Sequence, residues 1–147
     1  MIISEDTRFM DIALAEARQA YSEGEVPIGA VIVCNGQVIA KGHNQVESLT
    51  DITAHAEMLT ITSASNFLNA KILSRCTIYV TIEPCAMCAT AIGNAQIGRL
   101  VYGASEEKYG YRRWAPEVLH KSCKVVQGIR ADEAKHLMVS FFKERRK

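Results

Sequence analysis

Two short motifs, each placed where a helix is expected to begin, constrain the fold of this chain most strongly. His55 and Glu57 open one predicted helix, and Cys85 and Cys88, directly after Pro84, open a later one. One imidazole and two thiolates form a ligand set for a zinc ion that keeps its fourth position open, whereas structural zinc sites are closed by four protein ligands. Any fold of this chain must therefore bring two helix N-termini together.

The same motifs point to an enzyme, because Glu57 remains as a carboxylate that is not needed as a ligand. A lone His-x-Glu pattern arises often by chance, and a lone Cys-x-x-Cys also occurs in redox sites and structural zinc sites. Their combination is far more specific, particularly with a strand-like run and a proline before the first cysteine. A zinc ion beside a carboxylate that does not bind it can activate water for hydrolysis.

Composition sets wider bounds. With 147 residues, 48% of them hydrophobic and 22% charged, the chain is expected to form one domain over 1–147. Its net charge of +1 gives no overall attraction to nucleic acid. No apolar run is long enough to cross a membrane and no signal peptide is recognisable, so we expect a cytoplasmic protein. Beyond the two at ligand spacing, the remaining cysteines, Cys34, Cys76 and Cys123, are expected to be free thiols with packing roles.

The first half of the chain has the pattern of a helix, a hairpin and a second helix. Apolar residues at helical spacing predict a helix over 7–21 with Ser4 or Asp6 as its cap. Strands over 28–34 and 37–41 are joined at Asn35-Gly36, a strong hairpin signal. A polar loop over 43–51 precedes a helix that is expected to be capped by Asp51 or Thr53 and to end near position 65.

The second half alternates strands and helices. We expect strands over 76–82, 99–102 and 124–127, a helix over 85–95, a stretch without clear periodicity over 104–123, and a final helix over 131–145. This order predicts an α/β protein, a three-layer α/β/α sandwich with a mixed five-stranded sheet. Ligands bind at the carboxyl ends of strands in such folds, which is where both motifs are expected.

The motif residues 53–57 and 79–88 resemble those of the cytidine-deaminase-like superfamily, and within it the bacterial tRNA adenosine deaminases. The similarity extends over nearly the whole chain, including residues 26–31, 42–44, 97–99 and the terminal aromatic and basic residues. It implies a cytidine-deaminase-like fold, one Zn²⁺ per subunit held by His55, Cys85 and Cys88, and Glu57 as the catalytic proton shuttle.

The implied reaction is hydrolytic deamination of adenosine to inosine at the wobble position of tRNA, with attack by hydroxide at C6 of adenine. Two other function classes remain open. Deamination of a free base or nucleoside, such as guanine, cytosine or cytidine, would use the same chemistry in a sealed pocket. A non-catalytic zinc-stabilised binding module would need a fourth ligand, for which His43 and Cys34 are the candidates.

The resemblance also implies how substrate is recognised. Asn44 would bind the flipped base or its sugar, where the alternative is an ordinary turn residue. The pocket walls would come from Pro27, Ile28 and Ala54, and Glu106, where the family usually has Asp, would contact the sugar.

Two basic segments are candidates for contact with the anticodon arm of tRNA. The loop over 105–114 mixes aromatic residues with Lys108, Arg112 and Arg113, a composition suited to unpaired bases and phosphates. The terminal run contains Arg145 and Arg146. A solvated loop tethered by Trp114 and a frayed helix end are the alternatives.

A homodimer is implied as well, paired through the apolar run over 86–92. Thr90, which stands where the family usually has Gly, falls within this run and is expected to alter local packing.

Overall fold

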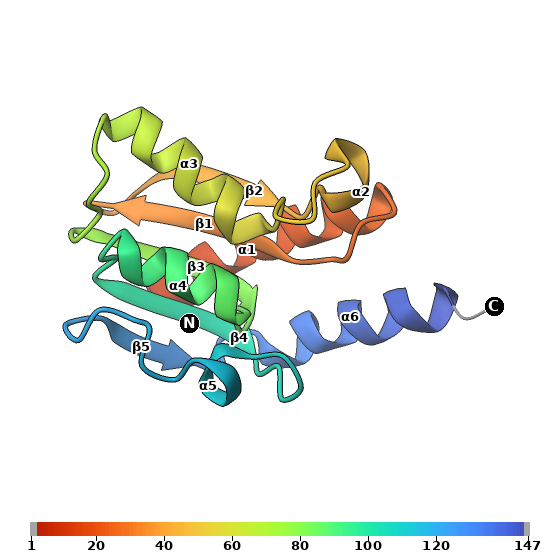
Figure 1. Cartoon of the computed structure of the whole chain (residues 1–147). Coiled ribbons are helices and arrows are strands. Elements are labelled where there is room, and N and C mark those ends of the chain that lie inside the picture. The colour runs from red at the N-terminus through yellow and green to blue at the C-terminus, as the bar shows by residue number, and fades with distance from the viewer. Residues whose placement is uncertain (1–2, 146–147) are drawn as a thin grey trace.

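The computed structural model describes residues 3–145 and shows one sheet covered on both faces by helices (Figure 1). Its elements, in chain order, are α1 (Glu5–Ser22), β1 (Gly29–Cys34), β2 (Gln37–His43), α2 (Val46–Leu49), α3 (Ala56–Leu68), β3 (Cys76–Ile82), α4 (Ala86–Asn94), β4 (Arg99–Ala104), α5 (Tyr111–Trp114), β5 (Lys124–Gln127) and α6 (Ala131–Arg145). None of the helices within 3–145 is long and apolar enough to span a membrane.

The five strands form one mixed sheet in the order β2-β1-β3-β4-β5. The β1–β2 hairpin is antiparallel, and β1 also pairs antiparallel with β3. From β3 onward the pairing is parallel, first with β4 and then with β5. Parallel neighbours require a crossover, which α4 supplies between β3 and β4. The predicted mixed five-stranded sheet is confirmed.

Alternate side chains of the central strands build a core on each face of the sheet. Ile32, Ile78 and Leu100 belong to the core cluster that also contains buried residues of α3 and α4. Val31 and Tyr79 point to the other face and pack against α1. Because side chains of a strand alternate between faces, these central strands are apolar on both sides. Figure 1 shows the resulting three layers, with α3 and α4 on one face and α1 and α6 on the other.

The local signals at the hairpin and the first helix were accurate. Asn35 and Gly36 adopt positive φ values of 53° and 74°, which the two-residue turn of a twisted hairpin requires. Ser4 caps α1 by accepting the Thr7 backbone N–H at 3.1 Å. The helix predicted over 131–145 coincides with α6.

Two local expectations were wrong. Helix α3 begins at Ala56 and has no cap from Asp51 or Thr53, because Asp51 Oδ1 instead accepts the Thr53 N–H at 2.8 Å in a tight turn. The expected loop over 43–51 contains the short helix α2. The stretch over 104–123, for which the sequence predicts no clear periodicity, contains the short helix α5. Both helices have only 4 residues, so helical periodicity could not reveal them.

Candidate metal and active site

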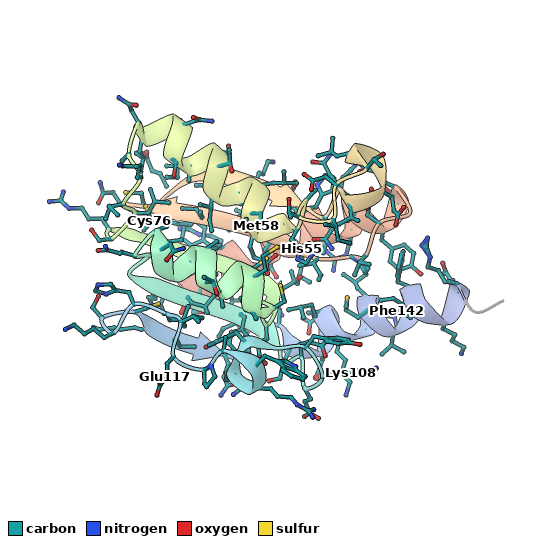
Figure 2. All side chains as sticks on the ribbon, viewed as in Figure 1. His55, Met58, Cys76, Lys108, Glu117 and Phe142 are labelled. Carbon is teal, nitrogen blue, oxygen red and sulfur yellow. The ribbon has the colours of Figure 1, made fainter. Side chains whose placement is uncertain are left out.

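Three potential metal ligands converge where α3 and α4 begin. His55 Nδ1 lies 3.7 Å from Cys85 Sγ and 3.4 Å from Cys88 Sγ. His55 and Cys85 are the N-cap residues of α3 and α4, and both have extended backbone. Figure 2 shows His55 beside the starts of the two helices. The two motifs therefore meet at helix N-termini, as their positions in the sequence predict.

The donor set fits a zinc ion. Zinc–sulfur and zinc–nitrogen bonds in a tetrahedron separate neighbouring donor atoms by roughly 3.5–3.8 Å, and both measured nitrogen–sulfur distances are close to this value. Two thiolates and an imidazole also suit zinc better than magnesium or calcium. Within residues 3–145 no fourth His, Cys, Asp or Glu joins the group. The arrangement therefore matches a site with one position left for water.

The environment of Cys85 favours the thiolate. Its pKa is lowered to about 4, first by the Cys88 thiol, then by His55 and by the backbone N–H of Cys88. That N–H is one of the donors at the start of α4 that lack a partner within the helix. The helix N-terminus thus contributes to the ionisation of a ligand, as a metal site requires.

Glu57 lies in the first turn of α3 and is almost completely buried. Its Oε1 is the one buried side-chain oxygen or nitrogen atom in the described chain without a hydrogen-bond partner. Burial, above all, raises the pKa of this carboxyl to about 7, and the nearby Cys85 adds to the shift. A buried carboxyl with one oxygen atom free of partners, beside three potential metal ligands, is placed to exchange a proton with a bound molecule.

A cavity of about 260 Å³ opens above this group. His55, Glu57 and Cys85 line its floor, and the walls come from segments far apart in the sequence. The other lining residues are Gly24, Glu25, Val26, Ile28, Asn44, Val46, Glu47, Ile82, Glu83, Glu106, Tyr109, Met138 and Arg145. A concave site with a few convergent polar groups around a perturbed carboxyl is the usual form of an active site.

Residues 4–146 match the family model of MafB19-like deaminases. The chain belongs to this deaminase family. It is 42% identical to a tRNA-specific adenosine deaminase of Agrobacterium fabrum, with 98% of each chain covered. A solved structure from a study of A-to-I editing by tRNA:A34 deaminases at the wobble position is also 42% identical, has a TM-score of 0.84, and is matched over 89% of this chain and 99% of the other. The structure of guanine deaminase from Bacillus subtilis is 35% identical with a TM-score of 0.66, over 76% of this chain and 74% of the other. The family and fold that the motifs predict are thereby confirmed.

In this deaminase Asn44 both lines the cavity and caps a helix. Its side chain is buried and lines the cavity. Its Oδ1 accepts the backbone N–H of Ala56 at 2.8 Å, and so satisfies a free donor at the start of α3. Asn44 is thus more than a turn residue, and its Nδ2 group remains to donate to a molecule in the cavity.

The other predicted pocket residues divide into two groups. Ile28 and Glu106 line the cavity. Glu106 Oε1 already accepts the backbone N–H groups of Lys108 at 2.9 Å and Tyr109 at 3.2 Å. Pro27 and Ala54 are buried and fall outside the cavity lining; the Ala54 carbonyl accepts the Gln45 N–H instead. Pro27 and Ala54 therefore lie behind the cavity wall and do not form part of its surface.

The basic residues of the loop over 105–114 differ in whether they are exposed or paired with other groups of the protein. Lys108 is exposed on this loop (Figure 2), and its Nζ lies over the Tyr109 ring. Arg113 is exposed and lies over the Trp114 ring. Arg112 is occupied within the protein, donating to Glu83 Oε1 at 3.3 Å and to the Ser105 hydroxyl at 3.1 Å. The sequence does not predict this ion pair, because a buried partner 29 residues away leaves no local signal.

Glu83 is the residue that the motif analysis missed. Its carboxylate is buried and accepts the backbone N–H groups of Glu106 at 3.1 Å and Arg112 at 3.2 Å. A Cβ on Gly110 would lie 2.2 Å from Glu83 Oε2, so glycine permits this close approach. The position of Glu83 just before Pro84, inside a metal motif, was the sequence signal that could have identified it. Glu83 fastens the loop that forms one wall of the cavity.

At the chain end, Arg145 lines the cavity and lies over the Phe141 ring, whereas Arg146 lies outside the described residues.

On α4, Ala89 and Ile92 are buried in this chain's own core, so only part of the run over 86–92 is exposed. The Thr90 hydroxyl donates to the Ala86 carbonyl at 2.7 Å, and its side chain faces outward.

Proposed function

We propose that this chain is a tRNA adenosine deaminase that hydrolyses adenosine to inosine at the wobble position of the anticodon arm. The observation that carries the proposal is the buried Glu57 carboxylate at the cavity floor, whose Oε1 has no hydrogen-bond partner, beside the His55, Cys85 and Cys88 cluster. The names of the full-length relatives support tRNA as the substrate.

Zinc is the proposed metal, one ion per subunit, held by His55, Cys85 and Cys88. When bound, it supplies a Lewis acid that lowers the pKa of water toward neutrality. Glu57 accepts the proton that the attacking water releases and delivers it to a ring nitrogen of the adenine. The water oxygen forms a bond to C6 and its second proton passes to the amino nitrogen. The bond from C6 to that nitrogen then breaks, so adenosine and water yield inosine and ammonia.

The chain's own groups hold the base in place. Asn44 Nδ2 is the proposed donor to the flipped base or its sugar, and Ile28 supplies an apolar wall. The free carboxylate oxygen of Glu106 is the proposed sugar contact. The proposed phosphate contacts, in a protein whose net charge is only +1, are the basic residues Lys108, Arg112, Arg113, Arg145 and Arg146.

The proposal extends to the assembly. The chain is proposed to be a single deaminase domain over 1–147 that acts as a homodimer through the outer face of α4, where Met87, Thr90 and Ala91 are at least partly exposed. Its substrate implies a cytoplasmic location. Sedimentation of the purified protein tests the dimer.

A Glu57→Gln variant tests the catalytic assignment. It should keep its zinc content and its melting temperature, and lose roughly 10²–10⁴-fold in the single-turnover rate. The assay measures inosine and ammonia from an anticodon stem-loop with A at the wobble position. Removal of the metal by a chelator should abolish the reaction in the wild type, and zinc should restore it. A variant that deaminates at nearly the wild-type rate would remove Glu57 from the mechanism.

Free guanine, adenosine and cytidine are assayed in parallel, because the similarity to a guanine deaminase structure keeps the small-substrate alternative in view. Ammonia from a free base, without inosine in the stem-loop, would replace the tRNA assignment by that alternative.

A further inference from the structure

Two cysteines outside the metal cluster lie opposite each other on neighbouring strands. Cys34 ends β1, Cys76 begins β3, and the antiparallel register pairs them directly. Paired residues point their side chains to the same face of a sheet, and both cysteines contact the same core cluster. Both are free thiols.

Backbone hydrogen bonds identify the kind of pair that they form. The Cys76 N–H donates to the Leu73 carbonyl at 3.0 Å, and the Cys76 carbonyl accepts the Gly98 N–H at 3.2 Å. The backbone N–H and C=O of Cys76 therefore bond to residues outside β1. Cys34 and Cys76 are consequently a non-hydrogen-bonded pair of the antiparallel ladder. Such pairs have Cα atoms about 4.5 Å apart, within the range of roughly 4.4–6.8 Å that a disulfide spans.

The two thiols differ in access to solvent. Cys34 is half-buried, whereas Cys76 is only 2% exposed. Burial raises the pKa of the Cys76 thiol to about 12, and the adjacent Cys34 thiol contributes to the shift. A reagent in solution therefore reaches Cys34 first, and Cys76 is placed to react only with a sulfur already attached there.

We propose that Cys34 and Cys76 are a site of reversible disulfide formation with a low-molecular-weight disulfide such as glutathione disulfide. The Cys34 thiolate attacks one reagent sulfur, forms a mixed disulfide and releases one thiolate. Cys76 loses its proton and attacks the Cys34 sulfur, and the mixed disulfide breaks to release the second thiolate. The two protein thiols lose two electrons and two protons, and the reagent gains them as two thiols.

The cross-link would join β1 and β3 at the end of the sheet remote from the metal motifs. β3 runs from Cys76 to Ile82, and the metal motif follows its other end. Figure 2 shows Cys76 well separated from His55. We therefore expect the oxidised protein to retain its metal and its deaminase activity. Its melting temperature should rise by on the order of 5 °C, because the cross-link restricts the unfolded chain.

The zinc-loaded protein is incubated with glutathione disulfide, quenched with acid, and digested with chymotrypsin. Cleavage after Tyr79 separates Cys76 from Cys85 and Cys88, so mass spectrometry can assign the linked peptides. The expected product joins the Cys34 and Cys76 peptides, with the loss of two hydrogens from the intact protein. A Cys123→Ser variant is the matched control and should form the same product.

A Cys76→Ala variant should instead accumulate glutathione on Cys34, and a Cys34→Ser variant should form neither product. Thermal melts establish that each variant is folded. Wild-type protein that keeps glutathione on Cys34, links Cys34 to Cys85 or Cys88, or leaves Cys34 unmodified would overturn the proposal.

Discussion

Asn44 shows how one side chain can belong to both the fold and the site. Its oxygen caps α3 through the Ala56 N–H, and the residue also lines the cavity. The first turn of the helix that carries Glu57 is thus bonded to a residue that is also a proposed substrate contact. Because the stabilising contact uses the oxygen and the proposed substrate contact uses the nitrogen, the two roles can be tested separately.

Asn44→Ala should lose both roles, whereas Asn44→Asp keeps an acceptor for the Ala56 N–H and loses the donor. We expect Ala to lower the free energy of unfolding by about 1 kcal/mol, and Asp to lower it less. Both variants should reduce kcat/KM on the stem-loop. Urea unfolding and single-turnover rates measure the two effects. An Asp variant with wild-type kcat/KM would show that the amide nitrogen does not serve the substrate.

Sequence-based prediction succeeded for residues whose neighbours along the chain carry the signal. His55, Cys85 and Cys88 are identified by spacing within two motifs, and the structure brings them together. The cap of α3 was missed because its acceptor lies 12 residues before Ala56, and capping rules assume a local partner. The ion pair between Arg112 and Glu83 was missed for the same reason, since a run of charged residues in the sequence does not show which of them has a buried partner.

At the level of elements, the loop over 105–114 is fastened to the metal motif. Glu83 accepts two of its backbone N–H groups, and Tyr111 N–H donates to the Pro84 carbonyl at 2.9 Å. Cys85 and Gly110 also form an isolated bridge. This docking places Glu106 and Tyr109 in the cavity wall, so the segment that carries the potential metal ligand Cys85 also supports the wall.

Arg112→Ala should therefore destabilise the fold by about 1–3 kcal/mol, because it leaves the buried Glu83 carboxylate without its cationic partner. Lys108→Ala is the matched control and should change stability by less than about 0.5 kcal/mol. The control should instead weaken tRNA binding and reduce its salt dependence by about one phosphate contact. Chemical unfolding and binding at several salt concentrations measure both. Equal stability losses in the two variants would contradict the docking role.

The longer elements were predictable because packing follows their patterns. All five strands and the four long helices occupy the expected regions, and the hairpin turn has the expected residues. Element ends were less accurate, as β2 and β4 each continue two residues further. Those extra residues extend toward the site, where pairing with a neighbouring strand rather than local propensity decides the boundary.

At the scale of the whole molecule, His43 ties the first helix to the edge of the sheet. Its Nδ1 lies 3.0 Å from Glu16 Oε1 and its Nε2 lies 2.9 Å from Glu23 Oε1. Burial opposes the charged imidazolium, but the two carboxylates outweigh it, and the pKa of His43 is raised above 6.5. With both ring nitrogens paired to carboxylates, the charged form contributes to the stability of the fold.

This contribution is fully present below the unfolded pKa of about 6.5 and is lost as pH rises through the higher folded pKa. A His43→Gln variant should be less stable than wild type by about 1 kcal/mol at pH near 6, and the difference should shrink in alkaline solution. Urea unfolding across this pH range provides the measurement. A stability difference that grows with pH would show that the imidazolium is not the stabilising form.

The cavity draws its walls from Gly24 near the start of the chain to Arg145 near its end. During synthesis the metal ligands leave the ribosome well before α6, so a growing chain could fold its sheet and collect its ligands while one wall is still missing. Catalytic competence should therefore appear abruptly, after the last helix has emerged, and not gradually as the chain lengthens. Unfinished chains would then be unable to edit RNA.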